Sequence, residues 1–150
     1  MRVTGYPGRI LGIDYGSRRV GIAVSDPMRV IAQGVATLGN DSNLAGALHS
    51  LIQEQGAVRI VVGIPYSPDG GKGSKALEVE KFIARLREIV NIEIETWDES
   101  FSSVNAHRAL IETGMRRKKR QGKARIDEMA ARLILQEYLD HHSTTPAQNG

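Results

Sequence analysis

The sequence contains no cysteine, so it can form no disulfide, no zinc–thiolate site and no cysteine nucleophile. No apolar stretch approaches the length of a transmembrane helix, and the first residues, MRVTGYPGR, lack the apolar run of a signal peptide. These absences predict a cytoplasmic protein with no membrane partner. The hydrophobic content of 41% and charged content of 25% are ordinary for a soluble globular chain.

Two common kinds of site motif are also missing. The glycine-rich segment at residues 70–73 matches neither the P-loop nor the dinucleotide fingerprint, which disfavours a nucleotide site there. Its backbone N–H groups could still face a phosphate at the start of the helix that follows. Ser17 follows a conspicuous G-I-D-Y-G motif but has no partner base, so a serine hydrolase is disfavoured.

Acidic residues are absent from one stretch, and basic residues gather there. Residues 116–125 include seven lysines and arginines, which leaves 13 of the 20 basic residues for the rest of the chain against all 17 acidic ones. A local basic run of this kind is typical of a phosphate-binding segment, although a solvated linker is the alternative. The basic residues are Arg116, Arg117, Lys118, Lys119, Arg120, Lys123 and Arg125.

The apolar pattern predicts one α/β domain over residues 1–141 and a disordered tail over 142–150. Residues 10–14, 20–24 and 30–38 read as three successive strands, typical of an antiparallel meander. Helical spacing then predicts a helix from Leu44 with Asp41 or Ser42 as its cap and Gly56 as its end. A buried strand at 59–64, a helix over 79–90, a half-exposed strand at 92–97, a short helix ending near Ile111 and a last helix over 126–139 complete the order.

Acids occur at three places where structure alone would not require them. Asp14 ends the first strand between Gly12 and Gly16, and Asp98 with Glu99 ends the strand at 92–97. Asp127 lies in the first turn of the last helix, near its apolar stripe. Each acid has a plain structural alternative: a turn residue, a solvated strand end, or a partner of the helix dipole.

Together these acids indicate a metal site. Clustered carboxylates stay ionised around a hard cation, and Mg²⁺ prefers oxygen ligands and keeps water positions open for phosphate. Two such ions could hold the attacking and leaving oxygens of a phosphodiester. We therefore expect Mg²⁺ or Mn²⁺ as the cofactor.

Four segments resemble the YqgF/RuvX family of bacteria, in the family's order and spacing. They are GIDYGSRRVGIAVSD, VVGIPYSPDGGKG, WDESFSS and RKKRQGKARIDEMAARLILQEYL, so the resemblance covers residues 9–139. It implies an RNase H-like fold: a mixed five-stranded sheet with helices on both faces. It also implies a nuclease that matures the 5′ end of pre-16S rRNA, or alternatively a Holliday junction resolvase.

The resemblance implies an acidic triad of Asp14, Glu99 and Asp127, which would be both the catalytic and the metal-binding residues. Asp98 is the runner-up to Glu99, because neighbouring strand residues face opposite sides. Ser100 stands where the family usually has Arg, so a phosphate contact by that Arg is missing here. The implied partners are structured RNA or branched DNA, and a pre-ribosomal particle; the protein would be a monomer or a homodimer.

Two other classes compete with the nuclease. The G-I-D-x-G-S pattern also opens actin-like ATPases and sugar kinases, but those need two such domains, and 150 residues supply one. A nucleic-acid-binding module without catalysis is the other alternative, and an intact acidic triad argues against it. The basic residues 116–125 are expected in a solvated loop. Because no aromatic residue lies among them to stack on a base, contacts with the nucleic-acid backbone are favoured.

Overall fold

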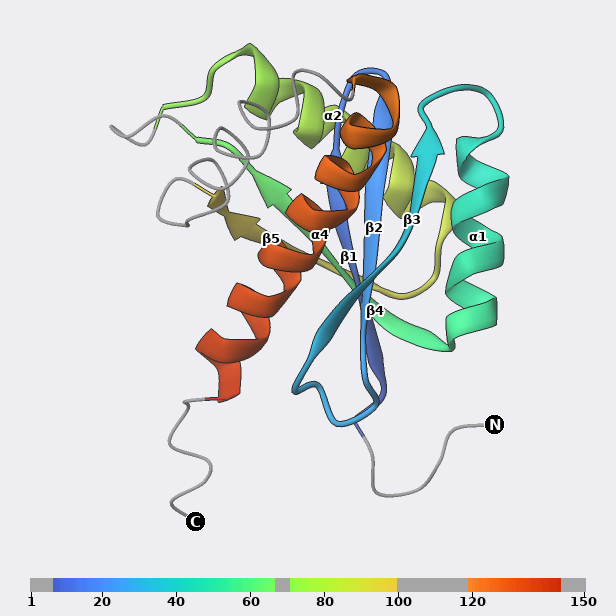
Figure 1. The fold of residues 1–150 in the computed structure, drawn as a ribbon, viewed down its shortest axis with the longest axis vertical. Helices are drawn as coiled ribbons and strands as arrows, with labels where there is room; N and C mark the ends of the chain where they lie inside the picture. Colours follow the sequence, from blue (N-terminus) through green and yellow to red (C-terminus); the bar gives the residue numbers. More distant parts are fainter. Residues whose placement is uncertain (1–6, 67–70, 100–118, 144–150) are drawn as a thin grey trace.

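The computed structural model describes residues 7–66, 71–99 and 119–143, with side chains in the last segment from Glu128 onward. Five strands form one sheet (Figure 1). Their bounds are β1 Arg9–Tyr15, β2 Arg19–Ser25, β3 Ala32–Gly39, β4 Ala57–Ile64 and β5 Glu93–Asp98. The described helices are α1 Leu44–Gln55, α2 Ser74–Ile89 and α4 Lys119–Ser143.

The sheet has the strand order β3-β2-β1-β4-β5, so β1 lies at its centre. β1, β2 and β3 pair antiparallel, whereas β4 pairs parallel to β1 and β5 parallel to β4. The meander is therefore confirmed, and so is the parallel position predicted for the buried strand at 59–64. Because β1, β4 and β5 run in one direction, their carboxyl ends share one edge of the sheet, which we call the carboxyl edge.

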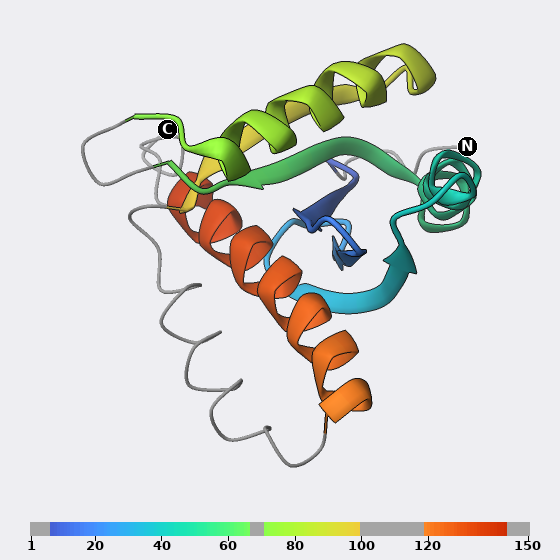
Figure 2. The same cartoon turned by 90° about the horizontal axis from the view of Figure 1, so that it is seen from above.

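Helices cover both faces of this sheet, as predicted. Figure 2 shows α2 on one side of the strands and α4 on the other, and α4 crosses the sheet diagonally. The apolar side chains divide in the same way. One core cluster joins the sheet to α1 and α2 through residues such as Ile13, Leu48 and Phe82. A second cluster joins the sheet to α4 through Ile10, Val61 and Leu135.

Period-two alternation assigns each strand residue to one of these two faces. Along β1, Leu11, Ile13 and Tyr15 point to the α1/α2 side, and the ring of Tyr15 stacks on Phe82 with centroids 4.3 Å apart. Ile10 and Gly12 point to the α4 side. Asp14, two residues further along the same strand, therefore also points to the α4 side.

Two helix ends differ from the sequence-based expectation. The residue at the N-cap position of α1 is Asn43, and not Asp41 or Ser42, and its side chain makes no capping hydrogen bond. The Asp41 carboxylate accepts a hydrogen bond from the N–H of Asn43 at 2.9 Å, which forms a turn before the helix. Gly56 ends α1 as predicted, with a φ of 64° that glycine adopts without strain.

Helix α4 is longer than predicted at both ends. It begins at Lys119, so residues 119–125 of the basic run are helical, and their placement in a solvated loop was wrong. The reason is local: Lys, Arg, Gln and Ala are strong helix formers, and one glycine does not prevent the helix from propagating through them. The helix also continues to Ser143, two residues into the predicted tail. The predicted short helix ending near Ile111 lies outside the described residues.

Candidate active site

Asp14 lies at the carboxyl edge on the central strand, and a glycine lies beside it on each neighbouring strand. Its antiparallel partner on β2 is Gly21. On the other side, the register pairs Ile13 with Val62, so the next residue of β4, Gly63, is beside Asp14. Neighbouring strands are about 4.8 Å apart, so side chains at positions 21 and 63 would crowd the Asp14 carboxylate. Glycine at both positions keeps side chains of β2 and β4 from crowding this acid.

Glu99, the residue after β5, lies over the strand next to Asp14. Its side chain covers Gly63, because a Cβ atom added there would lie 3.1 Å from both Cγ and Cδ of Glu99 and 2.7 Å from Cδ1 of Ile134. Glu99 is only 3% exposed, which is unusual for a carboxylate. The Glu99 carboxyl group therefore lies over the strand adjacent to Asp14, on the same face of the sheet.

Asp98, the alternative to Glu99, has the opposite orientation. It pairs with Ile64 of β4, and Ile64 belongs to the core on the α1/α2 side. Trp97, one residue earlier, packs in the cluster on the α4 side. The pleat of the strand thus turns Trp97 and Glu99 towards α4, and Asp98 away from Asp14.

Helix α4 lies close to the sheet because glycines line its path. A Cβ at Gly12 would lie 2.8 Å from Cβ of Leu135 and 3.3 Å from the carbonyl oxygen of Ala131. Leu135 is thus near Gly12, and the chain of α4 reaches Asp127 one helical turn before Ala131. The side chain of Asp127 lies outside the described residues, so its part in the site stays a prediction.

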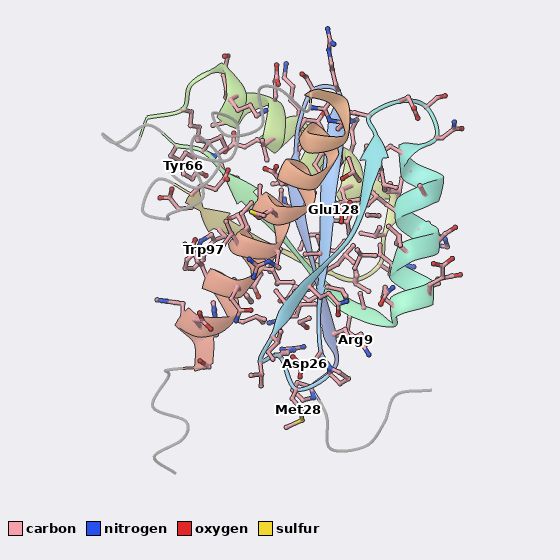
Figure 3. All side chains as sticks on the ribbon, viewed as in Figure 1. Arg9, Asp26, Met28, Tyr66, Trp97 and Glu128 are labelled. Atoms are coloured by element: carbon pink, nitrogen blue, oxygen red, sulfur yellow. The ribbon has the colours of Figure 1, made fainter. Side chains whose placement is uncertain are left out.

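A further acid, Glu128, lies near the site and was not among the predicted residues. Figure 3 shows Glu128 on α4 over the β2/β3 side of the sheet. The Thr37 hydroxyl donates to its Oε2 at 3.4 Å, and the Glu128 Cβ is 3.4 Å from where a Cβ at Gly34 would lie. Thr37 pairs with Gly21, the partner of Asp14, so the Glu128–Thr37 contact joins α4 to the strands beside Asp14. The paired acids at 127 and 128 and the glycine inside β3 were the available sequence signals.

Several predicted site residues cannot be placed. Arg116, Arg117, Lys118 and Ser100 lie outside the described residues, and only the backbone of residues 119–127 is described. Among the side chains that are described, no group of three or more His, Asp or Glu residues forms a metal site. The same part of the chain contains no helix with the length and apolar character of a membrane span.

The described acids nevertheless fit a hard cation. The carboxylates of Asp14 and Glu99 lie on one face of the sheet, beside and over Gly63. Oxygen donors are the ligands that Mg²⁺ and Mn²⁺ prefer. Like charges on one face repel each other, and a bound cation would compensate that repulsion. Asp14 and Glu99 would hold the ion, and Asp127 is the predicted third ligand.

A mixed sheet of this order, with helices on both faces, is the RNase H-like fold. A solved structure entitled "T. thermophilus RuvC in complex with Holliday junction substrate" has the same fold, with a TM-score of 0.55 at 13% identity, covering 92% of this chain and 97% of that one. This likeness concerns the fold alone.

The chain belongs to the family described as "RuvX: Holliday junction resolvase", whose model matches residues 8–141. A relative from Chlorobaculum tepidum is 43% identical over 136 residues, covering 90% of this chain and 95% of the relative. One from Ruminiclostridium cellulolyticum is 41% identical over 135 residues, covering 88% and 94%. Both are named "Putative pre-16S rRNA nuclease". The resemblance inferred from the sequence motifs is thus confirmed.

Proposed function

We propose that this protein is a Mg²⁺- or Mn²⁺-dependent nuclease that processes the 5′ end of pre-16S rRNA in the cytoplasm. The observation that carries the proposal is the position of two acids on one face at the carboxyl edge: the buried Glu99 lies over Gly63, and Gly63 is next to Asp14. The names of the relatives support RNA as the substrate. A pre-ribosomal particle is the proposed setting, and the protein acts as a monomer or a homodimer.

The residues have distinct parts in the proposed reaction. Asp14 comes from the central strand, which is paired on both sides, so its carboxylate is held rigidly. Glu99 is fixed by packing against β4 and Ile134. When bound, the metal would activate the attacking water and stabilise the leaving oxygen of the phosphodiester. The acids therefore contribute by positioning, and glycine at 63 lets the Glu99 side chain lie directly over β4.

The basic residues 116–125 support the same proposal. Their charge lies immediately before Asp127, where it would hold the backbone of the substrate through counterion release. Changing Arg116, Arg117, Lys118 and Lys119 to Ala should lower the slope of log affinity against log salt by about 0.7 per lost contact on single strands and about 0.9 on duplex. An unchanged slope would show that residues 116–125 have no role in binding nucleic acid.

Holliday junction resolution is the second candidate, favoured by the description of the family and by the shared fold with the resolvase structure. Both reactions break a phosphodiester bond, so the same acids serve either substrate. A binding module without catalysis is the third candidate. It leaves unexplained why a buried acid faces a second one across Gly63.

The test compares cleavage of a 16S precursor RNA with cleavage of a four-way DNA junction, each with Mg²⁺, Mn²⁺ or a chelator. Asp14→Asn keeps the shape of the side chain and removes its charge, so we expect it to abolish cleavage while folding and nucleic-acid binding persist. Asp26→Asn is the matched control, since Asp26 lies at the opposite edge of the sheet, after β2. Cleavage by Asp14→Asn at the wild-type rate would refute the assigned site, and cleavage of the junction alone would select the resolvase.

A further inference from the structure

The hairpin between β1 and β2 is a basic element at the same edge as the acids. β1 ends at Tyr15 and β2 begins at Arg19, so only residues 16–18 connect them. Asp14 pairs with Gly21 and Tyr15 with Val20, which puts the tip of the hairpin directly beyond the Asp14 position. Arg18 is exposed and Arg19 is half-buried, and residues 15–19 at the tip contain no acid.

The backbone of this tip is held in place by a residue from the end of β3. The Asn40 side chain donates from Nδ2 to the carbonyl oxygen of Gly16 at 2.7 Å, and the Asn40 N–H donates to the carbonyl oxygen of Arg18 at 2.9 Å. Gly16 makes the turn tight, because a Cβ there would lie 2.6 Å from the carbonyl oxygen of Arg19. Two hydrogen bonds and a close turn thus fix where the Arg18 backbone lies relative to Asp14.

The Arg18 guanidinium forms no hydrogen bond or ion pair with another group, as far as the described residues show. The acid that follows Asn40 in the chain is Asp41. Its carboxylate accepts a hydrogen bond from the N–H of Asn43 and lies beside Gly39. Arginine is suited to contacts with phosphate oxygens, because its planar donors match their geometry. Near a site of converging carboxylates, such a cation would also offset their repulsion of an approaching phosphate backbone.

We propose that the β1–β2 hairpin is a nucleic-acid contact surface in which Arg18 binds a backbone phosphate next to the cleavage site and Asn40 is its positioning residue. The inference rests on the proposed nuclease function and deepens it. It differs from the contribution of residues 116–125, because the hairpin belongs to the sheet that holds Asp14. A charge at this place would help set which phosphate faces the acids.

The first measurement is binding of the 16S precursor RNA and of the four-way DNA junction in chelator, so that cleavage does not interfere. Arg18→Ala should weaken affinity roughly fivefold to tenfold and lower the log–log salt slope by about 0.7–0.9, the amount for one phosphate contact. Arg87→Ala is the matched control: it removes an equally exposed arginine from the last turn of α2, and we expect wild-type affinity and slope.

The second measurement separates an organised contact from charge alone. Asn40→Ala changes no charge, and we expect a loss of about twofold to threefold in affinity with thermal unfolding recorded alongside. In the Arg18→Ala background the same change should cost nothing further, because the positioned group is already gone. An Asn40→Ala loss that is equal in both backgrounds would overturn the positioning role.

The outcomes distinguish this proposal from the nuclease itself. If Asp14 and metal are required for cleavage while Arg18→Ala binds with an unchanged slope, the hairpin proposal is overturned and the proposed function stands. If neither nucleic acid binds the wild-type protein, both are overturned. Rescue of affinity by Arg18→Lys with the wild-type salt slope would support a phosphate contact made through charge.

Discussion

The two edges of the sheet treat their charged side chains in opposite ways. At the amino ends of β4 and β5, Arg59 donates to Glu93 at 2.8 Å, lies 3.3 Å from Glu95 and donates to the Tyr138 hydroxyl at 3.2 Å. The Tyr138 hydroxyl in turn donates to Glu95 at 2.8 Å. At the carboxyl edge, Asp14 and Glu99 bring two charges of one sign to the same face.

Asp26 belongs to the first of these edges and shows the same balance. Figure 3 shows it near Met28 and Arg9, at the end of the sheet where β1 begins. Its carboxylate accepts the backbone N–H groups of Met28, Val30 and Ile31 at 3.1, 2.7 and 2.8 Å. Burial raises the pKa of Asp26, but these hydrogen bonds outweigh burial and lower it overall. Charges at the amino edge therefore stabilise the fold.

The carboxyl edge has a different kind of order. Asp14 and the buried Glu99 lie on one face of the sheet there, and acids gathered at a buried place are typical of a functional site. Buried or half-buried acids occur at both edges, so the role of an acid in this protein depends on the groups that surround it and not on its burial. The contrast between the edges predicts that removing an acidic charge at the carboxyl edge lowers activity, whereas removing one at the amino edge lowers stability.

The largest effect is expected for Glu99→Gln. Loss of this charge should reduce cleavage by at least about 100-fold, the loss typical when one electrostatic contact to a transition state is removed. Glu93→Gln, at the other end of β5, should cleave normally. Equal activity of the two variants would break the contrast between the edges.

Gly63→Ala tests whether the floor between the acids must be free of side chains. The added methyl would lie 2.7 Å from Ile134 and 3.1 Å from Glu99, so we expect a loss of about 1–3 kcal/mol in the free energy of unfolding. Cleavage measured well below the melting temperature should also fall, since Glu99 is displaced. Gly46→Ala in α1 is the control: its Cβ meets nothing within 4 Å, and a gain of about 0.5–1 kcal/mol is expected.

Asp26→Ala should lower the free energy of unfolding by about 1 kcal/mol at neutral pH, as for the loss of a side-chain cap, and leave cleavage unchanged. Because the pKa of Asp26 is lower in the folded state, its contribution is present above the unfolded value of about 3.9 and is lost as the pH falls through the folded value. Denaturant unfolding of both proteins from pH 7 to pH 2 should therefore converge in acid. Asp41→Ala, which removes one N–H contact in place of three, should have a smaller effect.

The smallest effect is expected for Tyr138→Phe at the amino edge. The hydroxyl links Arg59 to Glu95, but these two groups remain 3.3 Å apart without it. We therefore expect a loss of about 0.5–1 kcal/mol in the free energy of unfolding and unchanged cleavage. A large loss of cleavage in this variant would show that the two edges are coupled through α4.

The sequence alone was sufficient for much of the fold. Short apolar runs in β1 and β2, period-two alternation in β5 and helical spacing in α1 and α2 are local signals, since they depend only on neighbours in the chain. The long apolar run of β4 indicated a strand covered on both faces, and the structure buries it there. The resemblance of the motifs identified the family and marked Asp14, Glu99 and Asp127 as candidates.

Only the tertiary structure decided which of these groups meet. The pairing of Ile64 with Asp98 turns Glu99 towards Asp14, and a shift of one residue in that register would have turned Asp98 there instead. Asn40 reaches Gly16 across 24 residues of sequence, and Thr37 reaches Glu128 across 91. Such contacts depend on strand register and on how closely α4 lies over its glycines. Local periodicity specifies the face of each element, whereas the partner across that face is fixed only when the elements pack.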